Sequence, residues 1–294
     1  MKLEPECVGC LFNQVLRAFQ LLKPDISREI VLDTQKKLME YLMNLDMEQN
    51  ASPIFGKKLY KLVAEALGVK DPYTSIKKKF NQLAMQFYDE AKKIVDKAED
   101  PLFEAIVVAA LGNTIDLATQ HKIDFINDIK KFSPKNLVIN DYDKFKRALQ
   151  RTNHLLILGD NCGEIVFDKL LIVTIKKLYP DLEIIYSVRA APTINDVTIE
   201  DAKFVGLTDL VRVIEGSDTP GIHLPTSTNE FKKHFFLKDG VILSKGQGNF
   251  ESLYGMEIPD RKMFYLLKAK CSLMERIFKV KIGDLIFKMK TNSF

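Results

Sequence analysis

The pattern of hydrophobic and polar positions changes in character near residue 150. Before that point, apolar residues such as Leu11 and Val15 recur every three or four positions, the spacing that places them on one face of a helix. From His154 onward, short apolar runs alternate with helical stretches. We therefore predict a helical bundle domain over residues 1–150 and an α/β domain over residues 151–294.

Breaks at proline, glycine and capping residues divide the first part into helices. We expect these helices over residues 8–22, 27–45, 52–67, 71–98 and 101–116. The last of them carries Asn113 and Asp116 within an apolar stretch. Because a buried polar group needs a partner, these two side chains either hold helices together or line a site.

The second part contains short apolar runs typical of buried strands. They cover residues 155–158, 183–188, 211–214, 241–244 and 264–267, with residues 285–289 as an edge strand. Helical segments separate most of these runs. Such alternation predicts a three-layer, Rossmann-like α/β fold with a mostly parallel sheet between helices.

Polar residues follow each predicted strand. Asp160 and Asn161 end the first, and residues 189–196 the second. Residues 215–218 and 244–251 follow the next two. Ligands bind beyond the carboxyl ends of parallel strands, so we expect a site there.

Asp160, Asn161 and Asp196 offer oxygen atoms that can bind a divalent cation such as Mg²⁺, with waters or a substrate oxygen completing the shell. The simpler alternative is a turn from strand to helix in which Asp160 or Asn161 caps the helix. A cation beside free N–H groups of a helix start would suit phosphate chemistry.

The loop after the fourth strand adds features that suit an anion. Gly246 and Gly248 let backbone N–H groups approach it, and Lys245 and Lys270 can balance its charge. Glu164 shares a helix face with Asp168, which we expect to face solvent. The candidate substrate-binding and phosphate-binding residues are Glu164, Arg189, Asn195, Lys245, Gly246, Gln247, Gly248, Asn249 and Lys270.

Composition narrows the classes of partner. The chain has 294 residues, with 43 basic and 39 acidic side chains and a net charge of +4. So small a surplus argues against nucleic acid as the main partner. The charged start and the absence of an apolar run of about 18 residues argue against a signal peptide and a membrane partner. We expect a cytoplasmic protein.

The 4 cysteines are too few for a disulfide framework in a chain of this length, and we expect them to be reduced. Cys7 and Cys10 form a Cys-x-x-Cys pair before a predicted helix. A packed pair, a metal role and a redox role stay open for these two cysteines. A structural zinc site needs four ligands, and no second ligand pair has suitable spacing. Cys162 is interpreted as a packing residue.

Several blocks together resemble the metal-dependent damage-control phosphatases. The segments that carry this resemblance are DNCGEIVFD at 160–168, RAAPTINDVTIEDA at 189–202 and KGQGNFE at 245–251. Three further segments resemble the compact stand-alone branch of the family: CVGC at 7–10, DPY at 71–73 and GNTID at 112–116. The resemblance spans nearly the whole chain.

This resemblance implies a helical bundle against a Rossmann-like domain, and hydrolysis of phosphate esters that depends on Mn²⁺, Co²⁺, Ni²⁺ or Mg²⁺. It assigns the metal to Asp160, Asn161 and Asp196. It assigns substrate contacts to Glu164, to residues 245–249 and to Lys270 in preference to Lys268. The implied partner is a small phosphorylated metabolite, such as a sugar phosphate or a damaged phosphometabolite. The oligomeric state is open, with a homodimer as one alternative.

Two rival functions stay open. The first is a carboxyl methyltransferase that uses S-adenosylmethionine, although the glycine-rich loop usual in such enzymes is missing after the first strand. The second is a module that binds a phosphometabolite without turnover. A nucleotide kinase is disfavoured because the sequence has no Gly-x-x-x-x-Gly-Lys-Ser/Thr loop.

Overall fold

The computed structural model describes residues 1–45, 52–112, 129, 137–258 and 262–291. Its described helices are α1 (Pro5–Leu22), α2 (Arg28–Met43), α3 (Ser52–Leu67), α4 (Thr74–Met85), α5 (Tyr88–Lys97), α6 (Pro101–Leu111), α8 (Tyr142–Leu149), α9 (Glu164–Leu178), α10 (Ile199–Phe204), α11 (Asn229–Phe235), α12 (Gln247–Leu253) and α13 (Ser272–Phe278). Its described strands are β1 (Leu137–Asn140), β2 (His154–Leu158), β3 (Glu183–Val188), β4 (Arg212–Glu215), β5 (Val241–Lys245), β6 (Lys262–Lys268) and β7 (Leu285–Met289).

The strands form one sheet in the order β1-β7-β6-β5-β2-β3-β4. Neighbouring strands are parallel except β6 and β7, which are antiparallel. The predicted α/β fold with a mostly parallel sheet and a helical amino-terminal region is thus confirmed, and each predicted strand is present. The central strand β2 pairs with β3 and β5, so the loops after these three strands lie side by side.

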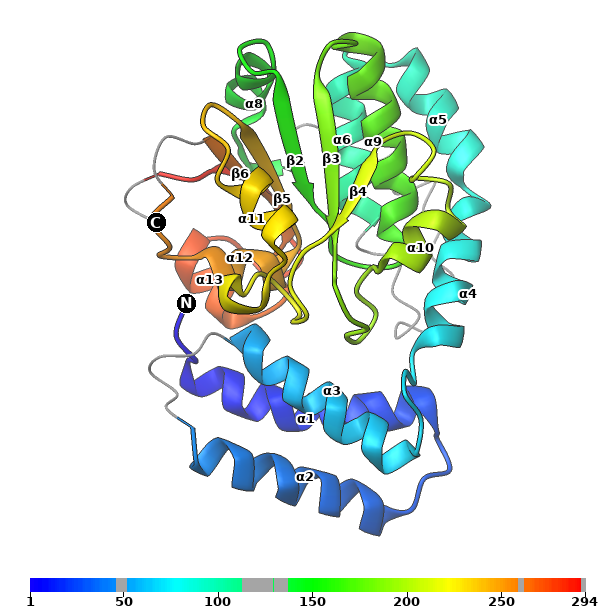
Figure 1. Ribbon diagram of the computed structural model, residues 1–294, viewed down its shortest axis with the longest axis vertical. Coiled ribbons are helices and arrows are strands. Elements are labelled where there is room, and N and C mark those ends of the chain that lie inside the picture. Colours follow the sequence, from blue (N-terminus) through cyan, green and yellow to red (C-terminus); the bar gives the residue numbers. More distant parts are fainter. Residues whose placement is uncertain (46–51, 113–128, 130–136, 259–261, 292–294) are drawn as a thin grey trace.

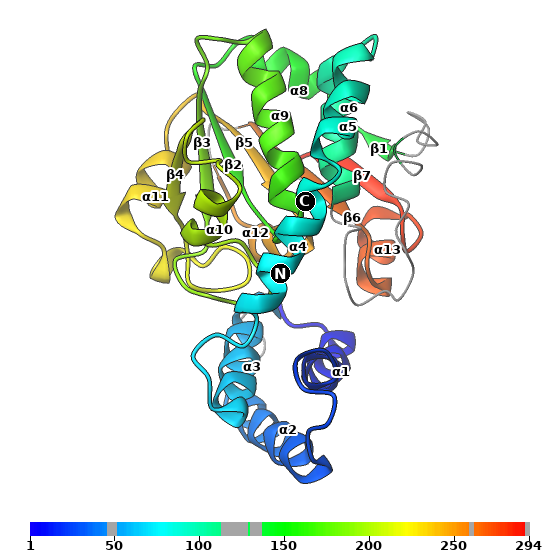
Figure 2. The same ribbon diagram turned by 90° about the vertical axis from the view of Figure 1, so that its right-hand side faces the viewer.

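The sheet is covered on both faces, which explains the uninterrupted apolar runs. Leu155 and Ile157 on β2 face one core, which they share with α6, α8 and α9. Leu156 and Leu158 face the opposite core, with α11, α12 and α13. Figure 2 shows α5, α6 and α9 together on one side of the strands.

Helices α1, α2 and α3 form a unit with a core of its own, which includes Val15, Phe19, Leu38 and Phe55. Ser27 caps α2, because its hydroxyl accepts a hydrogen bond from the Ile30 amide. Figures 1 and 2 show this helical unit as a separate layer beyond one end of the sheet. Helix α3 contacts α12 across the boundary.

Some elements differ from the prediction. The expected helix over residues 71–98 is wrong as a single element, because the chain turns at Gln86–Phe87 between α4 and α5. Strand β1 was not expected, and it pairs with β7 although it precedes residue 150. The domain division at residue 150 stays a prediction. Asn113 and Asp116 lie outside the described residues.

Among the described helices, none is both long enough and apolar enough to cross a membrane.

Candidate active site

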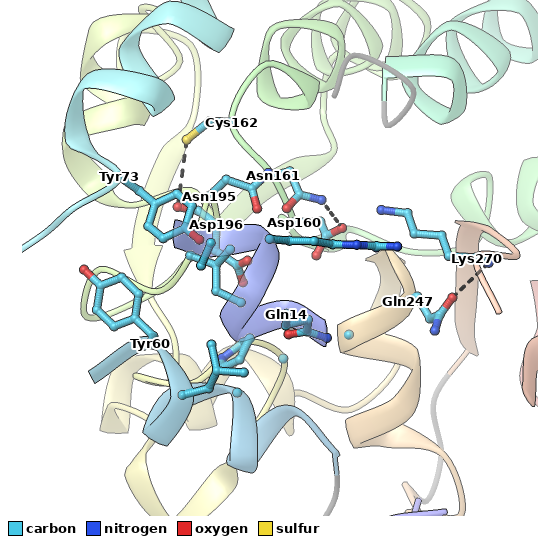
Figure 3. Close-up of a pocket in the computed structure, with 18 of the residues that line it drawn as sticks. Gln14, Tyr60, Tyr73, Asp160, Asn161, Cys162, Asn195, Asp196, Gln247 and Lys270 are labelled. Atoms are coloured by element: carbon cyan, nitrogen blue, oxygen red, sulfur yellow. Dashed lines mark hydrogen bonds between the residues drawn. The ribbon is translucent and has the colours of Figure 1, made fainter. Parts of the chain in front are cut away.

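Three oxygen-bearing side chains meet where the loops after β2 and β3 run alongside each other. Asn161 and Asp196 form an isolated antiparallel bridge. The Val197 amide donates to the Asp160 carbonyl at 3.0 Å, and the Cys162 amide donates to the Asn195 carbonyl at 2.9 Å. The two loops therefore bring Asp160, Asn161 and Asp196 together, as Figure 3 shows.

The loop after β5 closes against the same point because Gly246 has no side chain. This glycine has φ 77°, and a Cβ atom there would lie 1.9 Å from the Asp160 Oδ2 atom. A backbone in the left-handed region also favours glycine. Gly246 therefore fixes the distance between the β5 loop and the Asp160 carboxylate.

The two carboxylates of the site are buried, and one arginine compensates them in part. The Arg189 Nε–H donates to Asp196 Oδ2 at 2.6 Å, and Arg189 Nη2 lies 3.9 Å from Asp160 Oδ1. Burial raises the pKa of Asp196 to about 6; Arg189 opposes this shift and the charge of Asp160 adds to it. A site that crowds negative charge in this way attracts a cation.

The chemistry of the donors fits a hard divalent cation. Within the described ranges, no three His, Cys, Asp or Glu side chains converge as metal ligands. The cluster instead offers two carboxylates and the amide of Asn161, whose Nδ2 donates to Asp160 Oδ2 at 2.5 Å. Carboxylate and amide oxygens are suitable ligands for Mg²⁺ or Mn²⁺, whereas thiolates and imidazoles are absent from this cluster.

A second charged cluster lies directly behind this centre and is sealed from solvent. Lys245 Nζ lies 2.5 Å from Glu164 Oε1 and 2.5 Å from Asp168 Oδ1. The Tyr186 hydroxyl donates to Asp168 Oδ2 at 2.7 Å. The expectation that Asp168 faces solvent is wrong: its side chain is 0% exposed, because α9 turns this face toward β5.

Burial and pairing shift the pKa values of this second cluster. Burial is the main cause that raises the pKa of Glu164; Lys245 opposes it and Asp168 adds to it. Burial opposes the charge of Lys245, but Asp168 and Glu164 outweigh burial and raise the pKa of this lysine. The Lys245 ammonium group therefore forms ion pairs with the Glu164 and Asp168 carboxylates.

A pocket with a volume of about 410 Å³ opens in front of the three-residue centre. The strand-end loops line it with Asp160, Asn161, Cys162, Ile194, Asn195, Asp196, Gln247, Gly248 and Lys270. Figure 3 shows Tyr60 and Tyr73 on one side of this pocket and Gln247 and Lys270 on the other. Of the two candidate lysines, Lys270 lines the pocket and Lys268 does not.

The structure does not bring every candidate residue to the pocket surface. The predicted residues that do not line it are Glu164, Arg189, Lys245, Gly246 and Asn249. Asn249 is buried, and its Nδ2 donates to the Gly159 carbonyl at 3.0 Å and to the Lys245 carbonyl at 2.8 Å. The Asn249 side chain therefore stabilises the loop from within. A phosphate bound at residues 245–249 would instead contact the backbone near Gly248, which lines the pocket.

The opposite wall comes from the helical unit. Of its residues, the motifs in the sequence included only the segment at 71–73, to which they gave no role. Asp71 positions two aromatic residues of this wall: Tyr60 donates its hydroxyl to Asp71 Oδ1 at 3.0 Å, and the Tyr73 amide donates to the same atom at 2.9 Å. Ile194, in the loop that carries Asp196, has φ 46° and packs against the core of the helical unit. Such a backbone is strained for a β-branched residue, so packing holds this loop in place.

Helix α4 also supports the loop that carries Asp160 and Asn161. Asn81 is fully buried, and its Oδ1 accepts from the Gly163 amide at 2.7 Å. Its Nδ2 donates to Asp201 Oδ1 at 3.2 Å, and Lys77 pairs with Asp201 at 2.8 Å. This network fixes the turn at Gly163, which has φ 83°. Nothing in the spacing of α4 signalled it.

All four cysteines are free thiols. Cys162 is buried, and its Sγ lies 3.8 Å from the Asp196 carbonyl oxygen. Burial raises the pKa of this thiol well above its usual value, which argues against a thiolate nucleophile. Cys10 is exposed, and its Sγ accepts from Gln14 Nε2 at 3.4 Å.

Comparison with known proteins finds relatives over nearly the whole chain. Residues 3–286 match the family described as the damage-control phosphatase ARMT1-like domain. A damage-control phosphatase of Pyrococcus horikoshii is 33% identical over 292 residues, covering 97% of each chain. A damage-control phosphatase of Archaeoglobus fulgidus is 30% identical over 295 residues, covering 98% of this chain and 99% of the relative.

An uncharacterized protein of Methanocaldococcus jannaschii is 32% identical over 291 residues, which cover 97% of this chain and 94% of the relative. The crystal structure of a DUF89 family protein from P. horikoshii superposes with a TM-score of 0.85 at 30% identity. That match covers 97% of this chain and 98% of the other.

Proposed function

The chain belongs to the damage-control phosphatase ARMT1-like family, and from this membership we propose that it is a metal-dependent phosphatase of small phosphorylated metabolites. The reaction is hydrolysis of a phosphate monoester: water attacks phosphorus, the bond from phosphorus to the alcohol oxygen breaks, and the alcohol takes up a proton. The observation that carries the proposal is the meeting of Asp160, Asn161 and Asp196 at the wall of the pocket.

In this proposal Asp160, Asn161 and Asp196 hold one divalent cation, drawn from Mn²⁺, Co²⁺, Ni²⁺ and Mg²⁺. When bound, such an ion neutralises phosphate charge and lowers the pKa of a coordinated water. Arg189 keeps the Asp196 carboxylate charged and oriented through its 2.6 Å hydrogen bond. A hydrogen bond to one oxygen of a metal-binding carboxylate fixes the direction in which its other oxygen points.

The substrate phosphate would lie between the three-residue centre and the β5 and β6 loops. Lys270 lines this side and carries a positive charge, and Gly248 at the start of α12 presents backbone without a side chain. A dianionic phosphate gains charge-assisted hydrogen bonds from such groups. The helical unit would exclude water from the opposite side of the pocket.

The test is hydrolysis of phenyl phosphate by metal-stripped protein, titrated with each of the four cations. We expect turnover to return with metal, and Asp160→Ala and Asp196→Ala to lose at least about 100-fold in kcat/KM, since the cation supplies several kcal/mol of stabilisation. Circular dichroism checks that both variants are folded. Undiminished turnover by both variants at saturating metal would refute the assignment of the centre.

A further inference from the structure

Helix α1 presents one face to the pocket. Leu11, Gln14, Arg17, Ala18 and Leu21 all line the cavity, and their spacing of three and four residues places them along one side of the helix. Figure 3 shows α1 passing directly beneath Asp160, with Gln14 on it. The helix is therefore a wall of the reaction site as well as part of the helical core.

Arg17 differs from the other arginines for which the structure gives partners. Arg212 pairs with Glu230, Arg276 pairs with Glu4 and Glu6, and Arg189 is committed to Asp196 and the Gly221 carbonyl. In the described part of the chain, Arg17 is paired with no carboxylate. Its guanidinium is available to a ligand.

The charges around the cavity show what that ligand needs. The carboxylates that line the pocket are Asp160, Asp196 and Glu251, and the cationic side chains among the described lining residues are Arg17 and Lys270. A bound cation would compensate the first two carboxylates. A phosphate monoester brings up to two further negative charges, and a guanidinium matches its oxygens with a planar pair of donors.

We propose that Arg17 is a substrate-binding residue that contacts the phosphate from α1 while Lys270 contacts it from the β6 side. This proposal rests on the proposed function. It makes the active site composite, because the loops of the sheet would supply the metal ligands and the helical unit would supply Arg17, one of the two cationic side chains among the described lining residues. The ion pair between Lys57 and Asp218 and the pairs of Arg276 with Glu4 and Glu6 hold α3 and α1 in that position.

The test compares Arg17→Ala, Arg17→Lys and the control Arg28→Ala, which removes an exposed arginine from α2 outside the pocket. Two readouts are needed: phenyl phosphate kinetics with the activating metal, and calorimetric binding of inorganic phosphate in the presence of Mg²⁺. We expect Arg17→Ala to lose about 10- to 100-fold in both kcat/KM and phosphate affinity, the loss typical of one hydrogen bond to a charged group.

Two further results are expected from the same variants. Arg17→Lys should recover part of the phosphate affinity, and guanidinium ion at millimolar concentration should partly restore Arg17→Ala, which a merely structural role would not produce. Arg28→Ala should match the wild type. Circular dichroism confirms folding, and Arg17→Gln provides a second neutral variant if Arg17→Ala is unfolded.

The outcomes separate this proposal from the proposed function. Wild-type phosphate affinity and turnover in folded Arg17→Ala and Arg17→Gln would overturn the role of Arg17. A wild-type protein that binds phosphate through Arg17 but hydrolyses no ester would support the contact and refute the phosphatase. A wild-type protein that binds no phosphate with any of the four metals would overturn both.

Discussion

At the residue scale, Lys245 shows that a residue of a predicted phosphate-binding loop can point its side chain into the core instead of the pocket. Val241, Leu243 and Lys245 are alternate residues of β5, so their side chains project from the same face of the sheet. That face is covered by α6 and α9, where Glu164 and Asp168 receive the lysine. The sequence indicated that the loop after β5 carries glycine and amide residues. It could not indicate that Lys245 pairs with Glu164 and Asp168, because this pairing depends on how α9 packs over β5.

A substitution distinguishes the two roles of Lys245. We expect Lys245→Met to reduce the free energy of unfolding by about 3–5 kcal/mol, because it leaves two buried carboxylates without a counter-charge. Urea unfolding measures this change. The control is Lys270→Met, which removes an exposed pocket lysine and should change the free energy of unfolding by less than about 0.5 kcal/mol. A fully stable Lys245→Met with a raised KM would instead support direct phosphate contact.

At the scale of elements, the apolar strands were predictable, whereas two of the short helices, α12 and α13, were not. Strand β2 is five residues that are all buried, which makes its apolar run distinct. Helices α12 and α13 are each 7 residues long, less than two full turns, so their apolar residues do not repeat often enough to define a face. Strand β1 is four residues long and alternates in exposure, so it has no continuous apolar run that would mark it as a strand.

Helix α4 gives a prediction at this scale, because its Asn81 supports the proposed metal centre without being a lining residue of the pocket. Asn81→Ala leaves the buried Gly163 amide without an acceptor, which should cost about 1–3 kcal/mol of stability and loosen the loop that carries Asp160. We therefore expect weaker metal binding by calorimetry, with a smaller change in KM for phenyl phosphate.

Two variants on the same helix control for this effect. Asn81→Asp keeps an acceptor for the Gly163 amide and should retain more metal affinity than Asn81→Ala. Gln82→Ala removes an exposed neighbour on α4 and should leave stability and metal affinity unchanged. Equal metal affinity in Asn81→Ala and the wild type would show that α4 does not position the loop.

At the scale of the whole molecule, the pocket joins segments that are far apart in the chain. Asp160, Asn161 and Asp196 come from the β2 and β3 loops, and the opposite wall comes from α1 and α3. The meeting of these residues could be predicted because strand ends meet at one edge of a sheet. The individual residues of the opposite wall could not be predicted, since periodicity shows that a helix has an apolar face but not which surface covers it.

That wall predicts a preference among substrates. Leu11, Leu21, Leu59 and Val63 line the side of the cavity that would receive the alcohol, and each buried methylene contributes about 0.8 kcal/mol. We expect hexyl phosphate to have a KM at least about 10-fold below that of glycerol 1-phosphate. Both are primary alkyl esters, so leaving-group chemistry is matched. A lower KM for the glycerol ester would show that the wall does not bind the alcohol.

The pairing of Glu6 with Arg276 joins positions 270 residues apart, and this separation has a consequence for protein synthesis. Helix α1 leaves the ribosome early, whereas its partner α13 is translated near the end. At 5–20 residues per second, roughly 14–54 seconds pass between them. During that interval α1 can share a core with α2 and α3, but the pocket that it lines cannot close until Gln247 and Lys270 have been made.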